Sequence, residues 1–260
     1  MNRIMTVVRD DNPRADSIAA EFVAACELLD IEAGQEVANP EAIVAVGGDG
    51  TVLGAAATSL GLGIPVCGIN VGRVGYLAEF EPSEIDDIAD ALKTDSFSML
   101  EHATVGVEAG GAKGVAVNDV VVEKVMSHRI IELTVNINGE RLASYRTDGI
   151  IVATPLGSTA YNLSAGGPVV SPELDALILT PVAPHSLLSR AVVLAPDSVI
   201  EIVVTGDRPA TINIDGRRLT SVESGQPITI RRGETNVRFL SLGRHPFPHA
   251  VREKFGLDHA

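Results

Sequence analysis

A short apolar run that leads directly into a glycine-rich loop constrains the fold of this chain more than any other feature. Residues 43–46 read Ile-Val-Ala-Val, and the loop that follows consists of Gly47, Gly48, Asp49, Gly50 and Thr51. An unbroken run of small apolar residues is typical of a buried strand, and glycines permit the positive φ angles of a tight turn. We therefore predict a strand, a turn and a helix that begins near Thr51, which is the repeating unit of a parallel α/β sheet.

The glycine loop is also suited to binding phosphate. Backbone N–H groups at Gly47, Gly48, Gly50 and Thr51, together with the positive end of a helix dipole, would form an anion site. Asp49 needs a separate explanation, because a carboxylate about 4 Å from a phosphate charge is repelled by roughly 4 kcal/mol at an effective dielectric constant near 20. It could accept a proton from an attacking hydroxyl, hold Mg²⁺, or do both, and each role indicates phosphoryl transfer. The alternative is that Asp49 only caps the helix, and these five residues alone do not distinguish the two.

The composition restricts the partners of the chain. A formal charge of −14 and a pI of about 4.8 disfavour nucleic acid and anionic membrane as main partners. Sixteen arginines accompany only four lysines, which suggests a protein adapted to high salt; an acidic protein from an ordinary environment is the alternative. Cys26 and Cys67 lie in apolar surroundings without a C-x-x-C spacing, which indicates buried free thiols, no structural zinc and a cytoplasmic location.

The first part of the chain, residues 1–96, alternates strands and helices like an α/β domain with a Rossmann-like parallel sheet. Besides the glycine loop, it contains an expected strand at Ile4–Val8, a helix after Asn12-Pro13 and a strand at Pro65–Asn70. Gly34 is the expected stop of the first helix. Ligands in open α/β sheets lie at the carboxyl ends of the strands, so the second glycine-rich loop, Gly68–Leu77, should face the same site as Asp49. An ordinary glycine-rich turn is the alternative.

After Asp95 the apolar pattern changes from helical to alternating, which predicts an all-β second domain over residues 97–245. Asn138-Gly139 is the signature of a two-residue hairpin turn. The tail, residues 246–260, is expected to lie on the surface or to pack back on the first domain. The second domain should form a two-layer β-sandwich, with strands at Met99–Val107, Val115–Glu123, Ile131–Ile137, Ile150–Ala153, Ala191–Leu194, Val199–Val204, Thr211–Ile214, Ile228–Ile230 and Val237–Leu242.

A second informative stretch carries no charge from Gly149 to Pro172. After a break at Thr154-Pro155 it is dense in neutral hydrogen-bonding side chains, namely Ser158, Thr159, Tyr161, Asn162 and Ser164. Such a lining suits a base, a ribose or an amide, whereas a polar loop satisfied by its own backbone is the alternative. We favour the ligand for Thr159 and Tyr161, and the choice stays open for Ser158 and Ser164.

Three blocks, taken in order, resemble the NAD kinase family. They are Gly-Gly-Asp-Gly-Thr at 47–51, Asn-Asp-Val-Val-Val at 118–122 and Thr-Pro-Leu-Gly-Ser-Thr-Ala-Tyr at 154–161, with further matches at Pro184–Leu187 and Asp215-Gly216. The resemblance extends from about Val44 to Gly243. The third block is the most specific, because lipid kinases and phosphofructokinases share the glycine–aspartate loop. The chain departs from the family pattern at Val74, Leu156 and Ala191, and Leu156 puts one polar contact in doubt.

The resemblance implies an activity and places it on individual residues. A member of this family transfers the γ-phosphoryl group of ATP to the adenosine-ribose 2′-hydroxyl of NAD, with Mg²⁺ or another divalent cation on the donor phosphates. Asp49 matches the catalytic aspartate. The family also implies a homodimer or homotetramer. The residues that match contacts to NAD are Gly50, Tyr76, Asn118, Asp119, Asp148, Thr159, Ala160, Tyr161 and Ala183.

The residues themselves leave alternatives open. A carboxylate beside an amide, as at Asn118-Asp119, can accept from both hydroxyls of a ribose, but it can also be an Asx turn. Asp215-Gly216 is first of all a hairpin turn, and neither Asp215 nor His185 is expected to be catalytic. Two other functions remain: another kinase of the same glycine-loop class, acting on a lipid or sugar hydroxyl, and a non-catalytic NAD(P)-binding regulator.

Overall fold

The computed structural model describes residues 1–72, 75–126, 129–185, 188–244 and 246–257. Ser186 and Leu187, which belong to a block that matches the family, lie outside these ranges, as do Val74, where the chain departs from the family pattern, and the last three residues of the tail. The chain divides into two compact units. The first consists of residues 1–101 and 237–260, and the second of residues 102–236.

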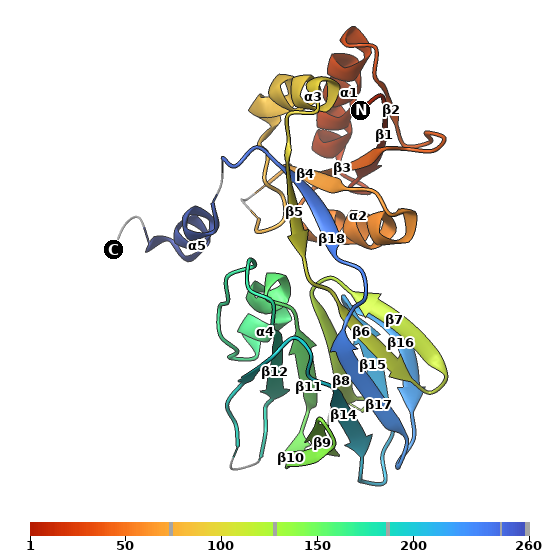
Figure 1. Ribbon diagram of the computed structural model, residues 1–260, viewed down its shortest axis with the longest axis vertical. Coiled ribbons are helices and arrows are strands. Elements are labelled where there is room, and N and C mark those ends of the chain that lie inside the picture. Colours follow the sequence, from red (N-terminus) through yellow and green to blue (C-terminus); the bar gives the residue numbers. More distant parts are fainter. Residues whose placement is uncertain (73–74, 127–128, 186–187, 245, 258–260) are drawn as a thin grey trace. The chain divides into compact units, whose positions relative to one another are not determined.

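The first unit is an α/β domain with a parallel sheet, as predicted. Its strands run in the order β2-β1-β3-β4-β18-β5. Helices α1 and α3 cover one face, where Phe22 and Ile88 pack against Val44 and Ile69, and α2 lies on the other face (Figure 1). The elements are β1 (Arg3–Val8), α1 (Pro13–Leu28), β2 (Glu32–Gly34), β3 (Ala42–Gly47), α2 (Asp49–Leu62), β4 (Val66–Asn70), the 3₁₀ turn η1 (Pro82–Glu84), α3 (Ile85–Thr94), β5 (Ser98–His102), β18 (Val237–Ser241) and α5 (Phe247–Phe255).

The start of α1 was predicted correctly and its end was not. Asn12 caps the helix, since its side-chain Oδ1 accepts from Arg14 N at 3.1 Å and Ala15 N at 3.2 Å. The helix stops at Leu28, before Gly34, which lies in β2. Asp30 makes the turn instead, with a φ of 55°. Aspartate tolerates this left-handed conformation better than most residues, so no glycine is required.

The second unit is a two-layer β-sandwich, as predicted. Its two antiparallel sheets have the orders β10-β9-β14-β17-β6-β7 and β13-β12-β11-β8-β15-β16, and their inner faces share one core of Val, Ile and Leu side chains. The elements are β6 (Val105–Ala109), β7 (Ala112–Ala116), β8 (Asp119–Lys124), β9 (Ile131–Ile137), β10 (Glu140–Thr147), β11 (Gly149–Ala153), η2 (Leu156–Thr159), α4 (Tyr161–Ser164), β12 (Leu177–Val182), β13 (Val192–Leu194), β14 (Ile200–Val204), β15 (Ala210–Ile214), β16 (Arg217–Val222) and β17 (Pro227–Arg232).

Both predicted hairpin turns are present in this unit. Asn138 and Gly139, between β9 and β10, have φ angles of 53° and 84°. Asp215 and Gly216, between β15 and β16, have φ angles of 47° and 75°. Both residues of each pair therefore have positive φ, as a type I′ turn requires. The strands β10, β12 and β16 were not predicted; in β10 most of the side chains are exposed, and only Tyr145 and Thr147 are buried.

Strand β18 lies in a different sheet from the one that its sequence suggested. It was expected among the strands of the β-rich domain, but it pairs in parallel with β4, with Phe239 opposite Val66. An alternating apolar pattern identifies a strand without identifying its neighbour, so this placement had no local signal. The chain thus returns to the first unit before α5.

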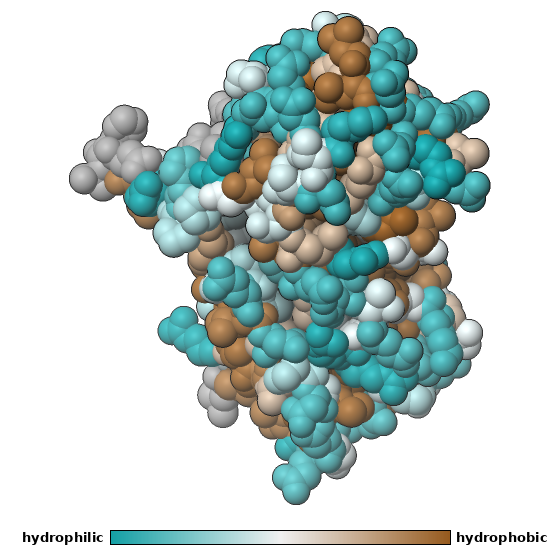
Figure 2. Space-filling model, turned by 45° about the horizontal axis from the view of Figure 1, so that its top comes forward, coloured by the Kyte–Doolittle hydropathy of each residue, from teal (hydrophilic) through white to brown (hydrophobic). Residues whose placement is uncertain are grey.

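The visible surface is largely hydrophilic (Figure 2). Among the residues that the structure describes, no helix is long and apolar enough to cross a membrane.

Candidate active site

The glycine loop of the first unit joins a fully buried strand to a helix. β3 ends at Gly47, Gly48 is the N-cap residue, and Asp49 is the first residue of α2. A Cβ atom at Gly47 would lie only 2.3 Å from Thr51 Oγ1, so this position requires glycine. Gly48 has no side chain to cap α2, which leaves the helix N-terminus suited to an anion.

Asp49 does not cap the helix that it begins. Its Oδ2 accepts a hydrogen bond from Tyr76 N at 3.1 Å, and its Oδ1 accepts one from Leu77 N at 3.0 Å. Gly75 lies against the same carboxylate, because a Cβ there would be 1.9 Å from Asp49 Oδ1. The two glycine-rich loops, at the ends of the neighbouring strands β3 and β4, therefore meet at Asp49 as expected. The alternative in which Asp49 is a simple helix cap is excluded.

Tyr76 carries an unused polar group beside Asp49. Its Oη atom is buried and has no hydrogen-bond partner among the described residues. Burial, and secondarily the negative charge of Asp49, raise the pKa of the Tyr76 hydroxyl. The hydroxyl thus stays a neutral donor, and an isolated buried hydroxyl of this kind costs free energy unless a ligand pairs with it.

Asn118 and Asp119, where β8 begins, bring two further buried polar groups. Asn118 Oδ1 is buried and accepts no hydrogen bond from the described residues. Asp119 is 5% exposed. Burial, and secondarily the charge of Asp215, raise the pKa of Asp119 to about 7. Buried acceptors of this kind suit the hydroxyl groups of a ribose.

Asp215 fixes the backbone that carries these two residues. Its Oδ2 accepts from Val117 N at 2.8 Å, and its Oδ1 accepts from Asn118 N at 2.8 Å and Asp119 N at 3.3 Å. The backbone N–H of Asp215 in turn donates to Asp119 O at 3.1 Å. Burial raises the pKa of Asp215, while the three backbone donors oppose this shift. The predicted turn at Asp215-Gly216 therefore also holds the backbone of residues 117–119 in place.

The other side of Asn118 is held by the Thr-Pro block. Thr154 N donates to Asn118 O at 2.9 Å, and Thr154 Oγ1 donates to Val117 O at 2.7 Å. Gly157 packs directly on Asn118, where a Cβ would lie 2.2 Å from its carbonyl oxygen. The blocks at 118–122 and 154–161, far apart in the sequence, thus build one structure.

The polar side chains after Thr154 divide into structural and accessible groups. Ser158 Oγ exchanges hydrogen bonds with Val170, and Asn162 is satisfied by Ser158 O, Pro168 O and the Thr180 hydroxyl. The backbone alternative is therefore correct for Ser158. Tyr161 is 41% exposed. Burial raises the pKa of its hydroxyl, followed by the charges of Glu123, Asp148 and Asp119, which places Tyr161 near three carboxylates.

Asp148 and Ala183 lie together at the ends of β10 and β12. Asp148 Oδ1 forms a 2.5 Å ion pair with Lys124 Nζ, and Asp148 N donates to Val182 O at 3.0 Å. Ala183 has a φ of 45°, an uncommon angle for a residue with a Cβ, and such strain is often found at ligand sites.

The structure brings some of the predicted residues together within each unit. Asp49 and its loop meet Tyr76 in the first unit. In the second unit Asn118 lies against the Thr-Pro block, and Asp148 lies beside the strand end that carries Ala183. Sequence reasoning missed the positioning contacts of Asp215, Thr154 and Gly157. The sequence did show the Asp215-Gly216 pair, but a hairpin turn was a sufficient explanation for it, so no further contact was expected.

Comparison with known proteins shows that both units of the chain match known protein families. Residues 6–97 match the family described as "ATP-NAD kinase N-terminal domain", and residues 117–242 match "ATP-NAD kinase C-terminal domain". The chain is 34% identical to NAD kinase 2 of Streptomyces avermitilis, over 98% of this chain and 84% of the relative. It is 37% identical to the NAD kinase of Lachnoclostridium phytofermentans, over 83% and 80% of the two chains.

Two solved structures are also similar. A crystal structure of an NAD kinase from Archaeoglobus fulgidus in complex with ATP has a TM-score of 0.78 at 27% identity and covers 98% of both chains. Yeast NADH kinase complexed with NADH has a TM-score of 0.87 at 21% identity, over 100% of this chain and 89% of that one. The second likeness concerns the fold alone.

Proposed function

The chain belongs to the NAD kinase family, and from this premise we propose how its residues carry out the transfer of a phosphoryl group from ATP to NAD. It is an enzyme, a kinase that uses ATP and acts on NAD. The acceptor atom in our proposal is the 2′-oxygen of the adenosine ribose. The assignment of individual residues, set out below, rests on the contacts of each unit taken by itself.

Asp49 acts as the general base. As the ribose O2′ forms its bond to the γ-phosphorus, the bond from that phosphorus to the β–γ bridging oxygen breaks and ADP leaves with the electron pair. The proton of the 2′-hydroxyl passes to the Asp49 carboxylate. The single observation that carries this role is that Tyr76 N and Leu77 N hold the carboxylate away from the helix that it begins. A carboxylate held in this way is fixed before substrate arrives.

The glycine loop binds phosphate through backbone groups. Gly47, Gly48, Gly50 and Thr51 surround the uncapped N-terminus of α2, where N–H groups and the helix dipole favour an anion. The close approach of Thr51 to Gly47 leaves no room for side chains on that side. The loop therefore presents mainly peptide groups to the phosphates.

In this proposal NAD is held by polar side chains, two of which, Tyr76 and Asn118, have a buried polar atom without a hydrogen-bond partner among the described residues. Asn118 and Asp119 accept hydrogen bonds from ribose hydroxyls, which is consistent with their burial and with the unpaired Asn118 Oδ1. Thr159, Ala160 and Tyr161 contact the base. The family resemblance further assigns contacts with NAD to Asp148 and Ala183 of the second unit and to Tyr76 of the first.

The donor phosphates would carry Mg²⁺, and Asp49 is the carboxylate that fits it. Among the described residues, no three His, Cys, Asp or Glu side chains form a metal-binding group. Mg²⁺ at nucleotide sites needs only one or two carboxylates, with waters and substrate phosphates as its other ligands. When bound, it neutralises charge on the phosphates. Asp49 Oδ1 accepts a single hydrogen bond from the described residues, that of Leu77 N, so it keeps a lone pair for a metal-bound water.

The proposal extends to the oligomeric state of the protein and to its cellular compartment. We propose a cytoplasmic homodimer or homotetramer. Cys26 and Cys67 support a reducing compartment, because both are free and buried, and burial raises the pKa of Cys26 to about 12. Size-exclusion chromatography with light scattering measures the mass of the assembly.

The deciding experiment is a product assay. The protein is incubated with ATP, NAD and Mg²⁺, and NADP is measured with a dehydrogenase specific for it. We expect stoichiometric NADP and ADP. Saturable binding of NAD without any product would indicate a regulator instead, and ADP formed only with a lipid or sugar acceptor would indicate another kinase of the glycine-loop class.

A further inference from the structure

The last helix of the chain brings a positive charge to the glycine loop. Lys254, on α5, places its Nζ atom 3.3 Å from Asp49 Oδ2. The same ammonium group lies 4.7 Å from the centre of the Tyr76 ring, within the range of a cation–π interaction. Lys254 thus contacts both the proposed base and the loop that holds it.

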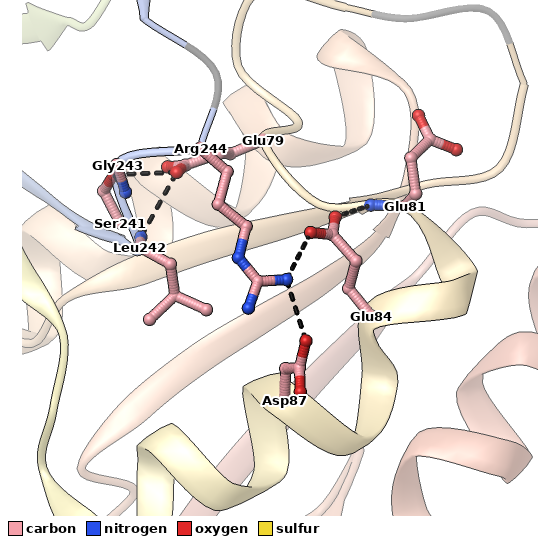
Figure 3. A network of polar contacts seen from close by, with 8 residues as sticks. All are labelled: Glu79, Glu81, Glu84, Asp87, Ser241, Leu242, Gly243 and Arg244. Atoms are coloured by element: carbon pink, nitrogen blue, oxygen red, sulfur yellow. Dashed lines mark hydrogen bonds and ion pairs between the residues drawn. The ribbon is translucent and has the colours of Figure 1, made fainter.

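The segment that leads into α5 is anchored to the first unit (Figure 3). Arg244 Nη1 lies 2.7 Å from Glu84 Oε1 and 2.8 Å from Asp87 Oδ2. Glu79 Oε1 accepts hydrogen bonds from Ser241 Oγ at 2.8 Å and Leu242 N at 3.2 Å. Glu79, Glu84 and Asp87 follow closely after Tyr76 and Leu77 in the chain. The C-terminal segment is therefore tied to the same stretch that holds Asp49.

The ion pair itself contributes little to the stability of the fold. The side chains of Lys254 and Asp49 are 39% and 33% exposed, and ion pairs so open to water have small net free energies. The position of the Lys254 ammonium group, however, would reduce the repulsion between Asp49 and a bound phosphate. Asp49 repels an incoming phosphate, and the chain has no Gly-Lys dipeptide and hence no P-loop lysine to offset that repulsion.

An ammonium group has three donors. One of them is used by Asp49 Oδ2, and among the residues that the structure describes Nζ donates to no other acceptor. Phosphate oxygens at the N-terminus of α2 are strong acceptors for such a point charge.

We propose that Lys254 binds a phosphate group of ATP at the glycine loop, so that the C-terminal helix is part of the donor site. This inference rests on the proposed function of the loop. The pyrophosphate of NAD offers the same chemistry, and the two sources are separated by measuring the KM of each substrate.

The test compares Lys254→Met, Lys254→Arg and the matched control Lys93→Met by steady-state kinetics. Lys93 lies on α3 and donates to Asp30 O at 3.4 Å. We expect Lys254→Met to raise the KM for ATP about tenfold or more, as the loss of a charge-assisted hydrogen bond implies. The KM for NAD should change less than about twofold, Lys254→Arg should recover part of the loss, and Lys93→Met should behave as the wild type.

Inorganic tripolyphosphate provides a second readout, because it carries the phosphate groups without the adenosine. Its inhibition constant against ATP should rise in Lys254→Met by about the same factor as the KM. If the role of Lys254 were purely structural, Lys254→Met would lower the melting temperature and raise the KM values of ATP and NAD by equal factors. Melting curves are therefore recorded for every variant. Arg244→Gln, which releases the anchor, should raise the KM for ATP by a smaller factor.

Three outcomes would overturn the inference while leaving the proposed function intact. If Lys254→Met forms NADP with an unchanged KM for ATP, the lysine does not bind the donor. A rise confined to the KM for NAD would assign the lysine to the acceptor. An increase in kcat would make Lys254 a restraint on Asp49. Failure of the wild type to form NADP would instead contradict the proposed function.

Discussion

The carboxylate of Asp215 accepts a 2.8 Å hydrogen bond from the backbone N–H of Asn118. These residues are 97 positions apart in the chain, and the contact fixes the peptide that presents Asn118 Oδ1 and the Asp119 carboxylate. Because Val117 N and Asp119 N donate to the same carboxylate, a side chain that touches no proposed substrate atom determines where the acceptor site lies.

Replacement of Asp215 by Asn should therefore weaken NAD binding. An amide has one acceptor oxygen, and its NH₂ group would face backbone N–H groups, so at least one buried donor loses its partner. We expect the KM for NAD to rise about tenfold or more, with the KM for ATP changed less than about twofold. Asp197→Asn, at an exposed position of the same unit, is the control. An equal rise in both KM values would contradict a local positioning role.

The affinity for NAD should depend on pH through Asp119. Its pKa is raised to about 7, and only the ionised carboxylate accepts hydrogen bonds from both ribose hydroxyls. Asp215 faces it from the β15–β16 turn and Tyr161 from α4. We expect the KM for NAD to fall as the pH rises from about 6 to 8, and Asp119→Asn to remove this dependence. A KM independent of pH in the wild type would refute the assignment.

The same carboxyl group should make the fold less stable as the pH rises. Its pKa is higher in the folded chain than the usual value of about 4 in an unfolded chain, so the folded state binds more protons between those two values. Stability should therefore fall from about pH 4 to pH 7 and then level off. The melting temperature of Asp119→Asn relative to the wild type should rise over this interval. A constant difference would show that Asp119 ionises normally.

Asp49→Asn separates catalysis from structure. The variant keeps the shape of the side chain but cannot take a proton, so kcat should fall about 10²- to 10⁴-fold while the KM for ATP holds or improves. Asp16→Asn, in the first turn of α1, is the matched control and should leave kcat unchanged. Melting curves check that both variants fold. A kcat for Asp49→Asn within a few-fold of the wild type would remove Asp49 from the mechanism.

Salt should stabilise the protein. With 34 acidic and 20 basic residues, the surface repels itself, and the Debye length falls from about 30 Å at 0.01 M to about 3 Å at 1 M salt. The melting temperature should rise steadily with KCl over this range. A flat or falling series would reject the hypothesis of adaptation to high salt.

The sequence alone determined those features that have a local cause. An apolar run followed by glycines and small helix-forming residues predicts a strand that passes through a short loop into a helix, and β3 does pass into α2 between Gly47 and Asp49, although the glycines at 47, 48 and 50 do not have positive φ angles. Asn-Gly or Asp-Gly between alternating residues makes a hairpin. The α/β order of the first unit and the β-sandwich of the second follow from the period of the apolar residues. Asp49 could be singled out because a carboxylate in a phosphate-binding loop needs an explanation, whereas Asn118 and Asp119 were singled out by the family resemblance; their roles stay predictions.

Only the tertiary structure decided which groups those residues would meet. Asp49 is held by amides of Tyr76 and Leu77, residues 27 and 28 positions further along the chain, and β18 joins the sheet of β4 after the whole second unit has intervened. The local sequence around Asp215 predicts a hairpin turn, and it does not indicate that the Asp215 carboxylate also accepts a hydrogen bond from Asn118 N. Contacts of this kind depend on which strands become neighbours. Burial and strand pairing across the whole fold decide this, so a local sequence pattern cannot predict these contacts.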